Sequence, residues 1–209
     1  MEKFTADRIV TINVDVQNDF CPGGALAVTD GDQVVEPLNQ LNEFTRANNG
    51  IVVATGDQHP TATPHFDTWP VHCVAGTEGA ALRHDLDIHD TDSIVDKGMG
   101  QTDGYSAFEG ITRDGRTLET IITPVGRERV AAIFGGLATD YCVLNSVLDG
   151  LRVNPGQGEL QIFVAQDAVK AVNIQPQDGQ DALAQMDKAG AHLVDTLAIL
   201  REEAFRLAK

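Results

Sequence analysis

The sequence alternates between short runs of β-branched residues and segments with helical periodicity, and this alternation is the pattern that most restricts the fold. Six runs have the composition of strands: 9–16, 51–55, 93–96, 130–134, 160–165 and, more weakly, 191–194. Between them, apolar residues recur at helical spacing in three segments: 34–44, 143–151 and 182–186. Strands that alternate with helices favour a three-layer α/β/α fold with a mostly parallel central sheet.

The size and charge of the chain narrow the classes of protein that it fits. Its 209 residues are 42% hydrophobic, which is enough to bury a full core, and we expect a single domain over 1–209. The formal net charge of -16 would repel the phosphates of nucleic acids and anionic membrane surfaces. We therefore expect a small molecule as the partner, with no nucleic acid and no membrane; self-association into a homo-oligomer stays open.

The cysteines bear on the compartment. Cys21, Cys73 and Cys142 cannot pair completely and form no Cys-x-x-Cys motif, which indicates a reducing environment and neither a disulfide framework nor a zinc knuckle. The N-terminal residues lack a signal-peptide pattern, and no apolar run approaches the roughly 18 residues of a membrane span. From these features we expect a cytoplasmic protein.

Reactive side chains follow the predicted strands at one edge of the sheet, where open α/β sheets bind their ligands. Asp15 ends the first strand, Asp57 follows the second, Lys97 follows the third, and the turn at 136–142 follows the fourth. An aspartate such as Asp15 in an apolar run is costly to bury alone, and a nearby lysine would relieve that cost. The alternatives are structural: a turn residue for Asp15 and a solvated charge for Lys97.

Cys142 lies where an apolar, strand-like stretch gives way to a helix-like one. If Thr139 or Asp140 caps that helix, Cys142 falls in its first turn, where free N–H groups and the positive end of the dipole favour the thiolate. The same N–H groups can bind an oxyanion. We therefore expect a reactive cysteine that is largely ionised near neutral pH; the alternative is a buried core cysteine.

A second group of residues has the composition of a metal site. Asp57, His59, His65 and His72 fall within one polar stretch, and residues two apart in an extended segment project to the same side. One carboxylate and three imidazoles suit Zn²⁺, Fe²⁺ or Mn²⁺, and of these we expect zinc. The alternative is a loop of surface histidines, which is the expectation for the other three: His84, His89 and His192.

Several ordered motifs are those of a known family. They are VDVQNDFCPGG at 14–24, DQHP at 57–60 with HF at 65–66, WPVHCV at 69–74, KG at 97–98 with YSAFEG at 105–110, and GLATDYCV at 136–143. In these motifs, which cover nearly its whole length, the chain resembles the nicotinamidase/pyrazinamidase family of isochorismatase-like cysteine hydrolases. The resemblance implies hydrolysis of nicotinamide, or pyrazinamide-type analogues, to the acid and ammonia.

The resemblance also implies roles for individual residues. The implied catalytic triad is Asp15, Lys97 and Cys142. The implied ligands of one divalent metal ion, which binds the pyridine nitrogen of the substrate, are Asp57, His59, His65 and His72. The implied substrate pocket contains Phe20, Trp69, Tyr105, Ala138 and Tyr141. A cis peptide bond between Leu137 and Ala138 would direct the N–H groups of Ala138 and Cys142 into an oxyanion hole.

Two departures affect the pocket, because the segment at 98–104 is longer than in some relatives and Tyr141 stands where relatives often carry histidine.

Three rival functions share part of this pattern. A cysteine amidohydrolase acting on a carbamoyl or ureido group would use Asp15, Lys97 and Cys142 but would not need the four metal residues. An isochorismatase hydrolyses a vinyl ether, and relatives of that type typically lack the nucleophilic cysteine. A metal-dependent sensor would bind pyridine carboxamides without turnover, and release of ammonia would exclude it.

Overall fold

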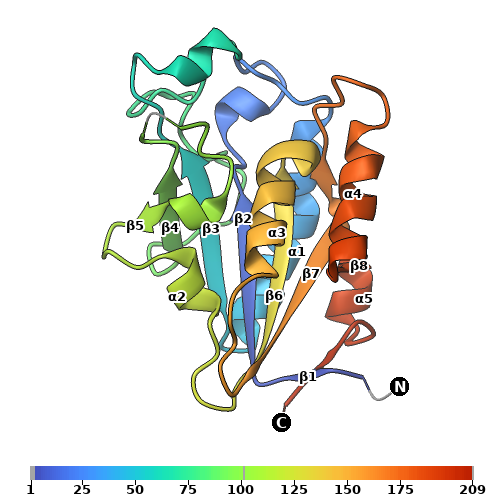
Figure 1. The fold of residues 1–209 in the computed structure, drawn as a ribbon. Coiled ribbons are helices and arrows are strands. Elements are labelled where there is room, and N and C mark those ends of the chain that lie inside the picture. Colours follow the sequence, from blue (N-terminus) through green and yellow to red (C-terminus); the bar gives the residue numbers. More distant parts are fainter. Residues whose placement is uncertain (1–2, 101, 209) are drawn as a thin grey trace.

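The computed structural model describes residues 3–100 and 102–208 and is built on a central seven-stranded sheet (Figure 1). The strand order is β5-β4-β3-β2-β6-β7-β8, and all neighbours are parallel except β4 and β5. The strands are β2 (Arg8–Val14), β3 (Ile51–Asp57), β4 (Ser93–Lys97), β5 (Ile111–Thr112), β6 (Arg129–Leu137), β7 (Glu159–Lys170) and β8 (His192–Val194).

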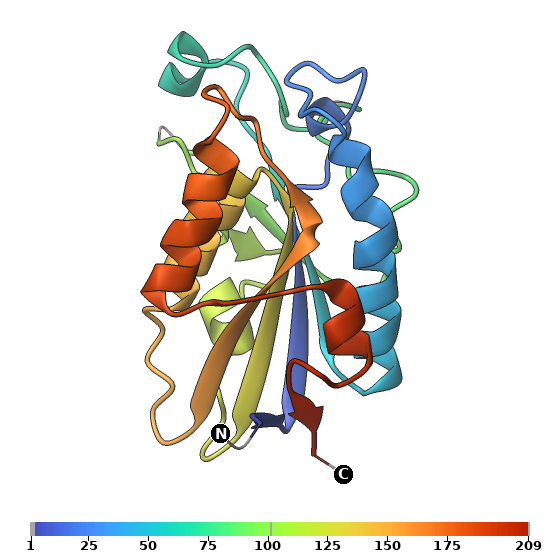
Figure 2. The same ribbon diagram turned by 90° about the vertical axis from the view of Figure 1, so that its right-hand side faces the viewer.

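Helices cover both faces of the sheet, which confirms the three-layer expectation (Figures 1 and 2). One face carries α2 (Leu118–Ile122), α3 (Leu144–Gly150) and α4 (Asp178–Ala189), and the other carries α1 (Val35–Ala47) and α5 (Thr196–Leu200). The middle strands are therefore buried on both sides, and this is why they read as continuous apolar runs.

The core divides into two clusters, one on each face, because successive side chains of a strand point to opposite sides. In β2, Ile9 packs into the cluster that contains Leu38 of α1. Ile12 packs into the other cluster, with Val147 of α3. Alternation along one buried strand thus fixes both helical layers against the sheet.

Several boundaries differ from the sequence expectation. The first strand ends at Val14 instead of residue 16, because Asp15 adopts a left-handed conformation with φ of 47°. The strands β6 and β7 extend beyond the predicted 130–134 and 160–165. Two short strands, β1 (Thr5–Ala6) and β9 (Arg206–Leu207), pair at the end of the molecule opposite the long loops (Figure 1).

Long loops cross the carboxyl ends of the strands (Figure 1). The long connection between β3 and β4 contains one described helical element, a 3-10 turn at Pro64–Asp67. Its backbone is tied down by bridges such as His59 with Val74 and Gln17 with Leu82. Within 3–100 and 102–208, no helix combines the length and apolar character needed to cross a membrane.

Candidate active site

Four strand ends bring the predicted reactive residues together. Asp15 follows β2, Asp57 is the last residue of β3, and Lys97 is the last residue of β4. Cys142 lies in the turn after β6. Ligand atoms of Asp15, Asp57 and Cys142 all lie within 4.8 Å of one another, as parallel strands sharing one edge allow.

Lys97 is the centre of this group. Its Nζ lies 2.8 Å from Asp15 Oδ2, 2.6 Å from Asp57 Oδ1, 2.9 Å from the Gly104 carbonyl oxygen and 3.5 Å from Cys142 Sγ. Burial opposes the charge of the ammonium, but the two carboxylates outweigh it and hold the pKa of Lys97 well above its usual value. The two buried carboxylates therefore share one permanent positive charge.

Asp15 is positioned by its backbone and by a neighbouring strand. Its left-handed φ turns the chain at the end of β2, and Thr55 in β3 donates a hydrogen bond to Asp15 Oδ1 at 2.6 Å. Burial raises the pKa of Asp15; the Lys97 ammonium lowers it, and the Asp57 carboxylate raises it further, so the net shift is upward. Asp15 is consequently a stronger base than an exposed aspartate.

The prediction that Cys142 is largely ionised near neutral pH is wrong. The residue is only 5% exposed, and burial raises the pKa of its thiol well above the usual value. The Lys97 ammonium opposes this shift, whereas the Asp15 and Asp57 carboxylates reinforce it. The cysteine is thus a thiol beside two carboxylates. The prediction failed because the sequence pattern does not reveal that two negative groups share the lysine.

The turn that carries Cys142 also differs from expectation. It is a π-helical turn at Thr139–Val143 that precedes α3, and Ala138 occupies the N-cap position. Neither Thr139 nor Asp140 caps it with a side chain. Asp140 instead accepts hydrogen bonds from the backbone N–H groups of Val172 and Asn173, both at 2.9 Å, which ties the turn to the end of β7.

The peptide bond between Leu137 and Ala138 is cis, as the resemblance implied. Just before it, Gly136 has φ of 118°, and a Cβ there would overlap the backbone of Val14. A glycine is therefore required for β6 to approach the end of β2 this closely. This approach brings the Cys142 turn up to Asp15.

The three predicted histidine ligands converge on one point. The candidate ligand atoms of His59, His65 and His72 lie within 4.8 Å of one another, and all three residues are buried. Each Nδ1 has an acceptor: the Gly98 carbonyl at 3.0 Å for His59, Asp103 Oδ1 at 2.8 Å for His65, and the Pro70 carbonyl at 2.7 Å for His72. An acceptor at Nδ1 places the proton there and leaves Nε2 with a free lone pair.

Asp57 completes the set. Its Oδ1 binds Lys97, and its Oδ2 lies 3.7 Å from His59 Nε2, a buried atom with no hydrogen-bond partner among the described residues. Burial raises the pKa of Asp57, but the Lys97 ammonium outweighs it, and the pKa is lowered to about 2. One ionised carboxylate and three imidazoles whose Nε2 lone pairs converge fit a divalent cation.

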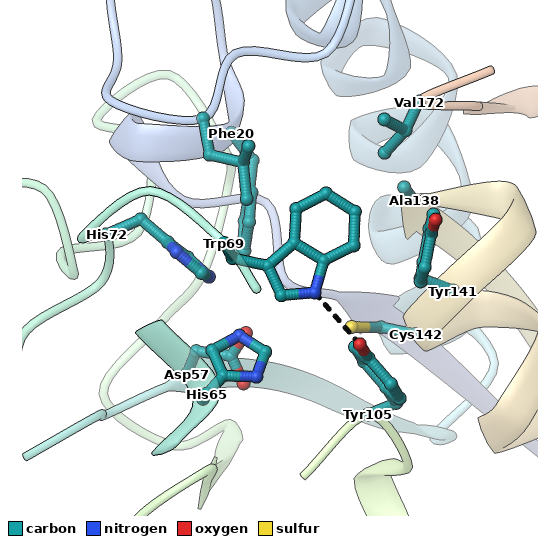
Figure 3. A pocket seen from close by; sticks show the side chains of 11 residues that line it. Phe20, Asp57, His65, Trp69, His72, Tyr105, Ala138, Tyr141, Cys142 and Val172 are labelled. Carbon is teal, nitrogen blue, oxygen red and sulfur yellow. Dashed lines mark hydrogen bonds between the residues drawn. The ribbon is translucent and has the colours of Figure 1, made fainter. Parts of the chain in front are cut away.

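A small cavity joins the two groups of residues (Figure 3). It is lined by Phe20, Leu26, Asp57, His65, Trp69, His72, Tyr105, Ala138, Tyr141, Cys142 and Val172. The Trp69 indole lies across it and donates a hydrogen bond to Tyr105 Oη at 2.9 Å (Figure 3). The cavity is small, with a free volume of about 30 Å³.

All predicted pocket residues line this cavity, but several supporting residues were missed. Leu26 and Val172 belong to loops that carry no local pattern for a pocket. In the sequence, nothing distinguishes Thr55 from the other residues of its strand, or Asp103 from an ordinary acidic residue on an exposed loop.

Comparison with known proteins identifies the family. The sequence model of the isochorismatase domain family matches residues 10–197 of this chain. The chain belongs to the isochorismatase domain family. It is 36% identical over 202 residues to the nicotinamidase of Escherichia coli (strain K12), a match that covers 86% of this chain and 91% of that protein.

Two solved structures of similar fold bear on the ligands of this isochorismatase-family site. Pyrazinamidase of Pyrococcus horikoshii, solved in complex with zinc, is 31% identical, with a TM-score of 0.76 and coverage of 90% of this chain and 99% of that one. PnC1 from L. infantum, solved in complex with nicotinate, is 26% identical, with a TM-score of 0.76 and coverage of 99% of both chains. The zinc complex and the histidine cluster together support a divalent metal ion in this site.

Proposed function

We propose that this protein hydrolyses nicotinamide to nicotinate and ammonia through a thioester on Cys142. The observation that carries the proposal is that a single cavity is lined by the Cys142 thiol and by Asp57, His65 and His72 of the metal cluster. One small ring bound there reaches both groups. Similarity to the nicotinamidase of Escherichia coli and to a protein solved with nicotinate supports the same substrate.

Asp57, His59, His65 and His72 are the proposed ligands of one divalent ion, which we assign as zinc because nitrogen-rich sites of this kind favour it. When bound, the metal supplies a Lewis-acidic contact for the pyridine nitrogen and so fixes the ring in the cavity. The converging imidazoles and the unpartnered Nε2 of His59 support this assignment. The aromatic walls, Phe20, Trp69, Tyr105 and Tyr141, enclose the ring.

In the acylation step, Asp15 accepts the proton of the Cys142 thiol as Sγ attacks the amide carbonyl carbon. A base of raised pKa suits this task, and Lys97 holds its carboxylate in place at 2.8 Å. The backbone N–H groups of Ala138 and Cys142 are the proposed donors to the developing oxyanion. Asp15 then returns the proton to the departing nitrogen, and ammonia leaves behind a thioester.

In the second step, Asp15 accepts a proton from water as the water oxygen attacks the thioester carbonyl carbon. The carbon–sulfur bond breaks, Asp15 returns the proton to Sγ, and the product leaves as nicotinic acid, which loses its remaining proton to solvent to give nicotinate. Lys97 stays charged throughout, because the two carboxylates hold its pKa high. Its role in both steps is to stabilise the Asp15 carboxylate between proton transfers and, throughout, the Asp57 carboxylate.

The test is ammonia release from nicotinamide by the purified protein, measured with and without chelator, together with elemental analysis. The proposal predicts stoichiometric nicotinate and ammonia and close to one divalent ion per chain. Binding of nicotinamide without ammonia release would favour the sensor. Release of ammonia from a carbamoyl or ureido compound, with none from nicotinamide, would favour the related amidohydrolase.

A further inference from the structure

The three histidines of the metal cluster differ in what accepts a hydrogen bond from Nδ1. His59 and His72 donate to the main-chain carbonyls of Gly98 and Pro70. His65 alone is paired with a side chain and a charge, the carboxylate of Asp103 at 2.8 Å. We propose that Asp103 is a positioning residue that sets the affinity and geometry of the metal site through His65.

The charge is what distinguishes this pair. A carboxylate that accepts the Nδ1 proton of an imidazole increases electron density at Nε2, and so makes that nitrogen a better ligand than a carbonyl acceptor does. The His65 side chain is 3% exposed and fixed by the pocket, whereas the Asp103 side chain is 54% exposed on a loop. The carboxylate therefore reaches the buried cluster from outside, without itself touching the cavity.

The loop that carries Asp103 also holds two other parts of the site. At its start, the Gly98 carbonyl accepts from His59, and at its end the Gly104 carbonyl accepts from Lys97 Nζ. Both glycines have positive φ, and a Cβ on Gly104 would lie 2.6 Å from Gly98 Cα. The loop is thus closed at its base, which places Asp103 beside His65; Gln101, within it, lies outside the described residues.

Residues that accept a hydrogen bond from a metal-binding histidine orient it, and their loss typically weakens metal binding by about 10- to 100-fold. Asp103→Ala removes both the acceptor and the charge, so we expect zinc binding about 10- to 100-fold weaker than in the wild type. Asp103→Asn keeps an acceptor oxygen but loses the charge, and we expect its zinc dissociation constant to lie between those of the wild type and Asp103→Ala. Asp103→Glu keeps the charge and should lie closest to the wild type.

The experiment is competition for Zn²⁺ between the full-length protein and a chromogenic chelator. The matched control is Asp67→Asn, which removes one exposed negative charge from the neighbouring metal loop; within the described residues, Asp67 forms no hydrogen bond with a histidine. Melting of the metal-free proteins checks the fold. We expect unchanged melting in every variant and an unchanged zinc dissociation constant in Asp67→Asn.

Zinc binding by Asp103→Ala at the wild-type affinity would overturn the inference, and so would equal weakening in Asp103→Ala and Asp67→Asn. If Asp103→Ala fails to fold, Asp103→Asn decides the matter by the same comparison with Asp67→Asn.

The inference rests on the metal site of the proposed function, and a second readout separates the two. With zinc saturating, Asp103→Ala should raise the KM for nicotinamide more than it lowers kcat, because the ion holds the ring in a displaced position. If Asp103→Ala binds zinc more weakly than the wild type but the wild type does not hydrolyse nicotinamide, the result supports the inference and contradicts the proposed function. Hydrolysis with equal zinc affinities would contradict the inference alone.

Discussion

Lys97 Nζ lies 2.6 Å from Asp57 Oδ1, so the carboxylate that faces the histidine cluster through Oδ2 is held by the ammonium through its other oxygen. The same nitrogen lies 2.8 Å from Asp15. One buried cation therefore joins the residues proposed for chemistry to those proposed for the metal.

Lys97→Ala should consequently destabilise the fold as well as the reaction. It leaves two buried carboxylates without their common partner, and breaking a buried pair of this kind costs about 3–5 kcal/mol. Urea unfolding of the metal-free protein measures the loss, with Lys188→Ala on the exposed side of α4 as the control. Equal unfolding midpoints in the two variants would contradict the claim that Lys97 neutralises the site.

Cys142→Ala should abolish turnover while leaving zinc bound, because the thiol is the proposed nucleophile and lies outside the metal set. We expect kcat to fall by at least about 10³-fold. Cys21→Ala is the control, since Cys21 is also buried but does not line the cavity. Substantial turnover by Cys142→Ala would exclude the thioester mechanism.

Asp15→Asn removes the proton acceptor but keeps a side chain of the same shape beside Lys97. Loss of a general base typically lowers kcat by about 10²–10⁴-fold, and we expect a loss of at least this order. The circular dichroism spectrum should be retained. Steady-state kinetics on nicotinamide checks this. A variant with ordinary kcat would remove Asp15 from the proton transfers.

The response to acid can be tested away from the active site, at the pair formed by Arg8 and Glu128. Two hydrogen bonds from Arg8, both 2.9 Å, lower the pKa of Glu128 below its usual value. A lowered pKa means that this stabilisation is complete above the pKa of the unfolded chain and is lost as pH falls through the folded value. Glu128→Gln should therefore cost about 1–2 kcal/mol at pH 7 and progressively less as the solution is acidified.

The control for this pair is Glu203→Gln, an exposed substitution near the C-terminus. Urea unfolding at neutral and acid pH should show a gap between the two variants that narrows with falling pH. A gap that stays constant or widens on acidification would show that the ion pair does not stabilise the folded state.

The sequence predicted the central sheet well because its strands are buried on both faces and leave continuous apolar runs. It did not predict β1, β5 or β9, which have two residues each and form by pairing alone. The left-handed turn at Asp15 was also missed, since an aspartate there fits either a strand or a turn. These features depend on neighbours that are distant in sequence.

The candidate site divides in the same way. Its ligand types were visible as a motif of one aspartate and three histidines. The thiol state of Cys142 was not, because it depends on two carboxylates that meet the cysteine only in the fold. Asp103 was missed because an acid on an exposed loop is usually a solvated charge, and only its distance of 2.8 Å to His65 sets it apart.

The central claim is that the cluster of Asp57, His59, His65 and His72 orients the ring of the same substrate whose amide Cys142 attacks. Benzamide tests it, because it has nearly the shape of nicotinamide but lacks the ring nitrogen. The measurement is kcat/KM for both amides with metal-loaded and metal-free protein.

We expect loaded protein to favour nicotinamide by at least about 100-fold, and removal of the metal to erase most of that preference while changing the benzamide rate little. A similar loss for both amides on metal removal would instead assign the metal to activation of water. Equal use of benzamide and nicotinamide by the loaded protein would contradict the account.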